Sequence, residues 1–208
     1  MHSLLHYQYS NQTKCAGTLQ LLENILLKHF DEAIRTDNIK SFKTTIIFTN
    51  TKLATDVQCH LCEKYPGIPE EKRPWVFNNS EKDAIDKNDI FNRTQPMHPF
   101  PIKLIITTSC MLMGLNVPNT DIVVNLGQVA NLSDMWQAAG RGGRRRGTDD
   151  KTRPIALLYN LLNASDMSKH TDKSVKDFMS SISCLSVTLC DYFGWFNQPI
   201  CQKCSNCC

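Results

Sequence analysis

The chain has 208 residues and a formal net charge of +3; 41% of its residues are hydrophobic and 21% are charged. These values are typical of a globular protein with a real core and exclude wholesale disorder. No apolar run approaches the length of a membrane span, and the first residues lack the basic start and apolar stretch of a secretory signal. Because the net charge is small, any role in binding nucleic acid has to rest on local sites.

The first predicted element is a helix over residues 18–34, where apolar residues recur at helical spacing. Short apolar runs then alternate with polar segments of helical character. The predicted strands are 44–49, 75–77, 104–108, 122–126 and 155–159, and the predicted helices are 52–64, 81–93 and 132–139. Strands that are apolar throughout and alternate with helices indicate an α/β fold with a parallel sheet flanked by helices. The proline-rich loop 94–101 is predicted to be an exposed excursion.

Beyond residue 159 the pattern changes. Apolar residues recur every three or four positions from Val175 to Phe193, which predicts one long amphipathic helix. Gly194 stands where such a helix would end. We therefore expect a small helical unit after the sheet.

The segment 137–147, QAAGRGGRRRG, is the most informative part of the sheet region. Its glycines allow the backbone to approach a ligand closely, and arginine carries a planar guanidinium that pairs well with phosphate. Arg141 and Arg144 are three residues apart and would project from one face of a helical turn. The other interpretation is a solvated basic loop. The glycines and the preceding Gln137 favour contact with phosphate or nucleic acid.

Six of the ten cysteines lie in the last 25 residues. Without a secretory signal we expect a reducing compartment, where clustered cysteines bind metal more often than they form disulfides. Cys201, Cys204 and Cys207 offer three thiolates, and tetrahedral Zn²⁺ needs a fourth ligand. Cys184 and Cys190 are both candidates, because local chemistry does not choose between them. Disulfides, or buried thiols in a degenerate site, are the alternatives.

Three segments, in order, resemble motifs of superfamily 2 helicases. QAAGRGGRRRG resembles motif VI, whose pattern is Q-x-x-G-R-x-G-R. TTSCMLMGLNVPNTDIVVNLG (107–127) resembles the motif V region of RecQ-like helicases, and TTIIFTNTKLATDVQCHL (44–61) resembles motif IV. Their order and spacing are similar to those of the second RecA-like lobe of a RecQ-like ATP-dependent DNA helicase, over roughly residues 40–160.

The resemblance implies roles for individual residues. Arg141 and Arg144 would reach the γ-phosphate of ATP as arginine fingers, with Gln137 orienting the site, so these three are the expected catalytic residues. ATP with Mg²⁺ would be shared with a first RecA-like lobe, and the residues expected to contact the nucleotide are Gly114, Asn116, Arg141 and Arg144. The residues expected to contact DNA are Thr49, Asn50, Thr108 and Ser109.

The sequence also departs from the family pattern. Asn116 stands where the family has Asp, and Leu112 replaces the first glycine of Gly-Met-Gly. The chain contains no Gly-Lys dipeptide and therefore no phosphate loop of the Walker A type. The tetrapeptide DEAI at 31–34 is similar to a Walker B box, but no strand is predicted before it, and we interpret the match as coincidence. The chain is thus expected to supply one lobe of a two-lobed motor.

The C-terminal cysteines resemble the zinc-binding subdomain of RecQ helicases. CLSVTLCDYFG (184–194) followed by CQKCSNCC (201–208) is similar to that subdomain, in which a helix cysteine stands eight residues before the tyrosine of Tyr-Phe-Gly. Cys184 has this position relative to Tyr192. The resemblance therefore implies a structural Zn²⁺ held by Cys184, Cys201, Cys204 and Cys207.

Three parts are predicted: an N-terminal segment with one helix (1–39), a helicase C-terminal lobe (40–160), and a helical zinc-binding subdomain truncated at its end (161–208). The implied function is part of an ATP-dependent 3′-to-5′ DNA helicase in the nucleus. Its expected partners are single-stranded DNA, the duplex junction and a first RecA-like lobe, with no membrane. Two alternatives stay open: a non-catalytic remnant that binds DNA or a protein, and an RNA helicase or RNA-sensor branch of superfamily 2.

Overall fold

The computed structural model describes residues 18–78, 87–95, 97–108, 117, 119–127, 131–142, 157–161, 172–181 and 183–194. Its strands are β1 (Thr45–Thr49), β2 (Trp75–Asn78), β3 (Leu104–Thr108), β4 (Ile122–Leu126) and β5 (Leu157–Leu161). Its α-helices are α1 (Thr18–Leu22), α2 (Lys28–Arg35), α3 (Thr51–Lys64), α4 (Lys87–Arg93), α5 (Leu132–Ala139), α6 (Lys173–Ser180) and α7 (Leu185–Phe193). A π-helical turn (Glu23–Leu27) joins α1 to α2, and short 3-10 turns lie at Ile39–Ser41 and Glu70–Lys72.

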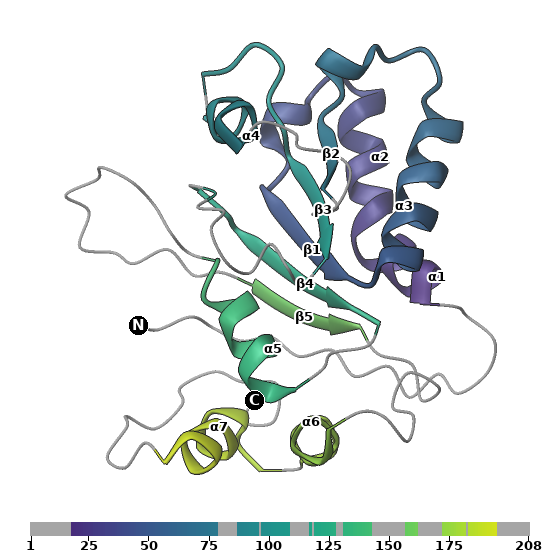
Figure 1. Ribbon diagram of the computed structural model, residues 1–208. Coiled ribbons are helices and arrows are strands. Elements are labelled where there is room, and N and C mark those ends of the chain that lie inside the picture. The colour runs from purple at the N-terminus through teal and green to yellow at the C-terminus, as the bar shows by residue number, and fades with distance from the viewer. Residues whose placement is uncertain are drawn as a thin grey trace.

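The five strands form one parallel sheet in the order β2-β3-β1-β4-β5 (Figure 1). β1 is central, with Thr45 opposite Leu104 of β3 on one side and opposite Ile122 of β4 on the other. Every residue of β1, β3 and β4 is buried, as expected for parallel strands covered on both faces. The predicted α/β fold with a parallel sheet flanked by helices is confirmed. In the part of the chain that is described, no helix has the length and apolar character needed to cross a membrane.

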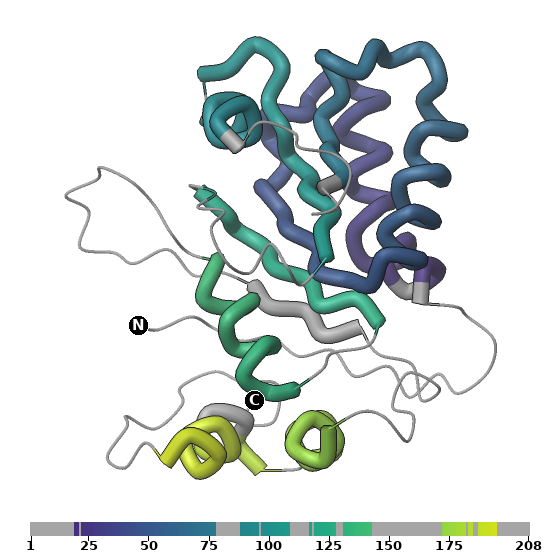
Figure 2. Tube along the Cα trace, in the orientation of Figure 1, coloured from purple at the N-terminus to yellow at the C-terminus, as the bar shows by residue number. Residues whose placement is uncertain are grey.

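Side chains alternate between the two faces of the sheet, and each face has its own core. Ile47 and Val124 lie on the face covered by α1, α2 and α3. Ile46 and Val123 lie on the other face, where α4, α5, α6 and α7 contribute buried side chains. Figures 1 and 2 show how these helices are arranged around the sheet. The helices after β4 therefore share one core with the sheet.

Asp31 joins two helices on the first face. Its carboxylate accepts the hydroxyl hydrogen of Tyr65 at 2.6 Å and pairs with the ammonium group of Lys64, so α2 is tied to the end of α3. Burial raises the pKa of Tyr65, and the bond to Asp31 raises it further. The DEAI tetrapeptide lies on α2, and this structural use of Asp31 agrees with its interpretation as a chance match.

A buried arginine holds the loop after α4. Arg93 is 8% exposed, and its guanidinium donates to the carbonyl of Phe100 at 3.1 Å and to that of Arg73 at 2.7 Å. Asp89, one turn earlier on α4, lies 3.9 Å from the same guanidinium. Burial lowers the pKa of Arg93, and the charge of Asp89 opposes that shift. Met97 is 90% exposed, which confirms the excursion at the centre of this loop.

The prediction of one long helix over 175–193 is wrong, because the segment forms two helices, α6 and α7. Ser181 follows α6 in extended geometry, and its Oγ accepts the N–H of Ser183 at 3.2 Å and lies 3.1 Å from the hydroxyl of Thr188. Serine and threonine side chains that bond to nearby backbone compete with helix formation. The turn that they stabilise interrupts the helix, although the apolar spacing continues through it, and both helices bury apolar side chains in the same core.

The other predicted elements are confirmed where they are described, with small shifts at their ends. The N-terminal helical stretch runs from Thr18 to Arg35 and contains a π-helical turn that apolar spacing alone did not indicate. α4 begins at Lys87, and residues 81–86 of the predicted helix lie outside the described residues. β5 begins at Leu157, so the first residues of the predicted strand also lie outside them.

Candidate functional site

Two threonines lie in register at the carboxyl ends of neighbouring strands. Thr49 ends β1 and Thr108 ends β3, and each is 7% exposed. The hydroxyl of Thr49 donates to the carbonyl of Leu126, at the end of β4, at 2.8 Å. The structure thus brings together two of the residues that are predicted to contact DNA. The hydroxyl hydrogen of Thr49, however, is already donated to Leu126 and joins β1 to β4.

Asn50 is the N-cap residue of α3. Its Oδ1 accepts the N–H of Leu53 at 2.9 Å, which leaves the Nδ2 amino group as the donor of this exposed side chain toward a ligand. The first N–H groups of a helix have no partner within the helix, and such a helix start attracts phosphate. Lys52 is exposed on the first turn and adds positive charge there. Sequence reasoning missed Lys52, although its place directly after the motif IV strand could have indicated it.

Gly127 follows β4 at the same edge of the sheet and passes close to α3. Its φ is 79°, in the left-handed region. A β-carbon at this position would lie 2.6 Å from Cδ1 of Leu53 and 3.8 Å from Nδ2 of Asn50. Glycine meets both requirements, since it tolerates a positive φ and has no side chain. Gly127 therefore lies against the first turn of α3.

α5 leads away from this edge of the sheet. The helix begins beside the carboxyl end of β4 and runs back along the sheet (Figure 1). Asn131 caps its start, because its Oδ1 accepts the N–H of Asp134 at 2.8 Å. Residues 140–142, directly after α5, therefore lie at the opposite end of the helix from the strand ends that carry Thr49 and Thr108, so the described residues include two separate polar places.

Gln137 and Arg141 lie together at the end of α5. Gln137 is exposed and Arg141 is half-buried, and the two are one helical turn apart in the sequence. Arg141 lies in a turn directly after the helix, where its N–H donates to the carbonyl of Ala138 at 2.9 Å. The remaining predicted residues of the nucleotide and DNA sites lie outside the described residues: Ser109, Gly114, Asn116 and Arg144.

Cys184 is half-buried against the core, directly before α7. It is thus the N-cap residue of α7. The prediction of one long helix had placed it inside a helix, and that position is wrong. Cys190 lies on α7, where burial, and then the charges of Asp191 and Cys184, raise the pKa of its thiol. A raised pKa disfavours the thiolate, which is the form that binds metal. The other three predicted ligands lie outside the described residues, and within those residues no group of three or more candidate ligands gathers.

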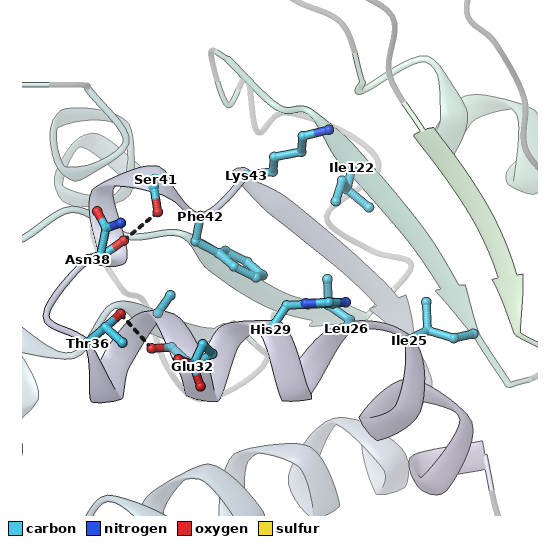
Figure 3. Close-up of a pocket in the computed structure, with 11 residues that line it drawn as sticks. Ile25, Leu26, His29, Glu32, Thr36, Asn38, Ser41, Phe42, Lys43 and Ile122 are labelled. Carbon is cyan, nitrogen blue, oxygen red and sulfur yellow. Dashed lines mark hydrogen bonds between the residues drawn. The ribbon is translucent and has the colours of Figure 1, made fainter.

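A hollow of about 440 Å³ lies on the other face of the sheet, between α2 and the amino ends of β1 and β4 (Figure 3). Leu26 and the buried ring of Phe42 contribute apolar lining, whereas His29, Glu32 and Lys43 are exposed at its edge. None of the predicted site residues lines this hollow. The hollow is therefore separate from the candidate site.

A comparison with protein families identifies what kind of lobe this is. Residues 20–146 match the family model described as the helicase conserved C-terminal domain. The chain belongs to this helicase family. The helicase C-terminal domain match begins within α1, and α1 and α2 share a core with the sheet. The boundaries predicted at residues 39 and 160 stay a prediction.

Curated relatives of this helicase domain are distant and much longer. The chain is 24% identical over 147 residues to a protein of Acanthamoeba polyphaga mimivirus provisionally named an ATP-dependent RNA helicase, which covers 64% of this chain and 25% of that protein. It is 26% identical over 121 residues to the ATP-dependent DNA helicase RecQ of Pasteurella multocida (strain Pm70), which covers 51% of this chain and 18% of that protein. The chain thus spans a quarter or less of the length of these relatives.

Among solved structures, the DUF1998 helicase MrfA bound to DNA shares the fold. The superposition has a TM-score of 0.52 at 15% sequence identity, and it covers 97% of this chain and 24% of that one. The α/β sheet is therefore a RecA-like lobe of the helicase C-terminal type. Helicases of this family generally use ATP with Mg²⁺ and bind nucleic acid.

Proposed function

We propose that the chain is the second motor lobe of an ATP-dependent DNA helicase of the RecQ type, which couples ATP hydrolysis to 3′-to-5′ movement along single-stranded DNA and to unwinding. The observation that supports this most is the presence of two separate polar places on one lobe. One comprises the ends of β1 and β3 with the start of α3, and the other is the turn after α5. A motor lobe needs both, because it holds nucleic acid at one place and meets the nucleotide at the other.

In this proposal the turn after α5 meets ATP that a first RecA-like lobe binds. Arg141 and Arg144 stabilise the negative charge that develops around the γ-phosphate, and Gln137 helps to orient them. Gly114 and Asn116 contact the same nucleotide. The first lobe supplies the phosphate loop and the carboxylate for Mg²⁺, since this chain contains no Gly-Lys dipeptide.

The start of α3 holds the DNA backbone in the same proposal. Its first N–H groups, the Nδ2 group of Asn50 and the ammonium group of Lys52 are the donors for phosphate oxygens. Thr108 and Ser109 contact the backbone beside them. Thr49 contributes through its main chain, because its hydroxyl hydrogen already bonds to Leu126.

The RecQ type is preferred over two other candidates. One of the curated relatives is a RecQ helicase, and the C-terminal cysteines follow the RecQ spacing. An RNA helicase is the second candidate, favoured by the mimivirus relative. A non-catalytic remnant is the third, favoured by Asn116 and by the lack of a phosphate loop in this chain. We propose a nuclear location for the chain as part of the RecQ proposal.

The proposed DNA site predicts the effect of one lysine. Lys52→Ala is expected to weaken binding of a single-stranded DNA oligonucleotide and to reduce the salt slope of log K by about 0.7, because one phosphate contact is lost. Fluorescence anisotropy over a range of salt concentrations measures both quantities. Lys40→Ala is the control, since Lys40 is exposed in the turn before β1, at the opposite edge of the sheet.

The Lys40 variant is expected to bind as the unchanged chain does. Equal losses in the two variants would mean that binding follows overall charge and not the start of α3. Single-stranded RNA bound more tightly than DNA of the same sequence would favour the RNA helicase candidate.

We also propose the structural Zn²⁺ for the C-terminal cysteines. Four thiolates suit tetrahedral zinc and leave no open position for catalysis. Cys184 fits a structural role, because it is half-buried beside the core at the start of α7. Its proposed co-ligands are Cys201, Cys204 and Cys207.

The zinc proposal predicts different results for two cysteines. The purified chain is expected to carry one zinc ion, Cys204→Ser to lose it together with the folded C-terminal helices, and Cys190→Ser to keep both. Metal analysis and the amide exchange of α6 and α7 measure the two effects. Zinc lost from the Cys190 variant but kept in the Cys204 variant would overturn the ligand choice.

A further inference from the structure

α5 lies between the sheet and the two C-terminal helices. Met135 and Ala138 of α5 belong to the buried cluster that includes Val123 of the sheet, Val175 of α6 and Leu189 of α7. Small and unbranched side chains on α5 allow this close packing. The helix that leads to Arg141 is thus held from two sides, and one of those sides belongs to the part of the chain beyond the sheet.

One aromatic pair connects α5 directly to α7. The rings of Trp136 and Phe193 lie 6.2 Å apart, with 47° between their planes, and both side chains are half-buried. Phe193 also meets the ring of Tyr192 edge-on, with 4.9 Å between the ring centroids. Phe193 is the last residue of α7, and Gly194 ends the helix in the left-handed conformation with φ of 65°. The ring of Phe193 therefore contacts α5 from the very end of α7.

The turn that carries Arg141 moves with the end of α5. The N–H of Gly140 donates to the carbonyl of Trp136 at 2.9 Å, and the N–H of Gly142 donates to that of Ala139 at 3.0 Å. Together with the bond from Arg141 to Ala138, three hydrogen bonds join the turn to the last turn of the helix. Any tilt of α5 therefore displaces the backbone of Arg141.

We propose that Trp136 and Phe193 are positioning residues for Arg141, so that the C-terminal helices set the geometry of the nucleotide site without touching the nucleotide. The inference rests on the proposed role of Arg141 at the γ-phosphate. Misplacement of a catalytic group by about 1 Å can lower a rate about a hundredfold, so a helix contact outside the site affects the chemistry. Trp136 holds α5, and Phe193 transmits the position of α7 to it.

Amide hydrogen exchange of the whole chain, measured by NMR without nucleotide, tests the connection. Phe193→Ala is expected to speed exchange at Gly140, Arg141 and Gly142 about tenfold, which is the order of effect that loss of an aromatic pair gives. Phe193→Tyr keeps the ring and is expected to exchange as the unchanged chain does. Val187→Ala is the matched control, since Val187 lies on the same helix and is 46% exposed.

A double variant separates positioning from general loss of stability. Trp136→Ala alone is expected to have the effect of Phe193→Ala, and the two together no more than either one, because they remove the same contact. Faster exchange in β1 and β3 to the same degree would overturn the proposal, as would unchanged exchange at the turn. Because no nucleotide is present, this result is independent of whether Arg141 binds phosphate.

Discussion

Arg141→Ala is expected to lower the kcat for ATP hydrolysis about a thousandfold or more, once the chain is combined with a RecA-like lobe that carries a phosphate loop. The guanidinium stabilises charge that exists only in the transition state, so kcat and kcat/KM fall together while KM changes little. Arg141→Lys keeps the charge but loses the planar fork and is expected to recover little of the rate. Steady-state ATP hydrolysis with and without single-stranded DNA provides the measurement.

Arg35→Ala is the control for this experiment. Arg35 is exposed on α2, on the other face of the sheet, where it pairs with Glu32. Its removal is expected to leave kcat unchanged. If the Arg141 and Arg35 variants hydrolyse ATP at the same rate, Arg141 is not an arginine finger.

Arg93→Ala is expected to lower the free energy of unfolding by about 3 kcal/mol, the largest stability effect that we predict. The substitution leaves the carbonyls of Phe100 and Arg73 without their donor and opens space beneath the loop. Arg93→Met keeps most of the apolar part of the side chain but removes the guanidinium, and it therefore separates packing from hydrogen bonding. It is expected to restore less than half of the free energy of unfolding that Arg93→Ala loses. Urea denaturation followed by circular dichroism measures each variant.

The exposed Arg35 again serves as the comparison. Its ion pair with Glu32 lies on the surface, where the two side chains are 75% and 55% exposed. Such pairs contribute about 0.5 kcal/mol or less. Equal destabilisation by Arg93→Ala and Arg35→Ala would show that the guanidinium of Arg93 is not what holds the loop.

The strands could be predicted from the sequence because the signal is local. Runs such as IIF at 46–48 are apolar on both faces, and a parallel sheet covered by helices buries both faces. The break between α6 and α7 could not be predicted in this way. The apolar period continues through it, and the break depends on the bonds that Ser181 makes with Ser183 and Thr188.

The site was predictable only where motif and backbone agree. Asn50 stands between a predicted strand and a predicted helix, so its place at the strand end could be predicted. Its role as the N-cap of α3 is consistent with its residue type, since asparagine is a preferred N-cap residue. The bond from Thr49 to Leu126 could not, because it spans 77 residues. The contact between Trp136 and Phe193 could not be predicted either, because it joins two segments that are far apart in the sequence and neither local pattern indicates the other as a neighbour.

The central place of β1 has a consequence for synthesis on the ribosome. β1 is made before β3 and β4, its neighbours in the sheet, and the 77 residues from Thr49 to Leu126 take about 4–15 s at about 5–20 residues per second. Until β3 has been made, Ile46, Ile47 and Phe48 form an apolar strand with both edges unpaired, and one edge stays unpaired until β4 follows. Unpaired apolar strand edges of this kind pair with other chains. A message that ends between β1 and β3 is therefore expected to yield a fragment prone to aggregation.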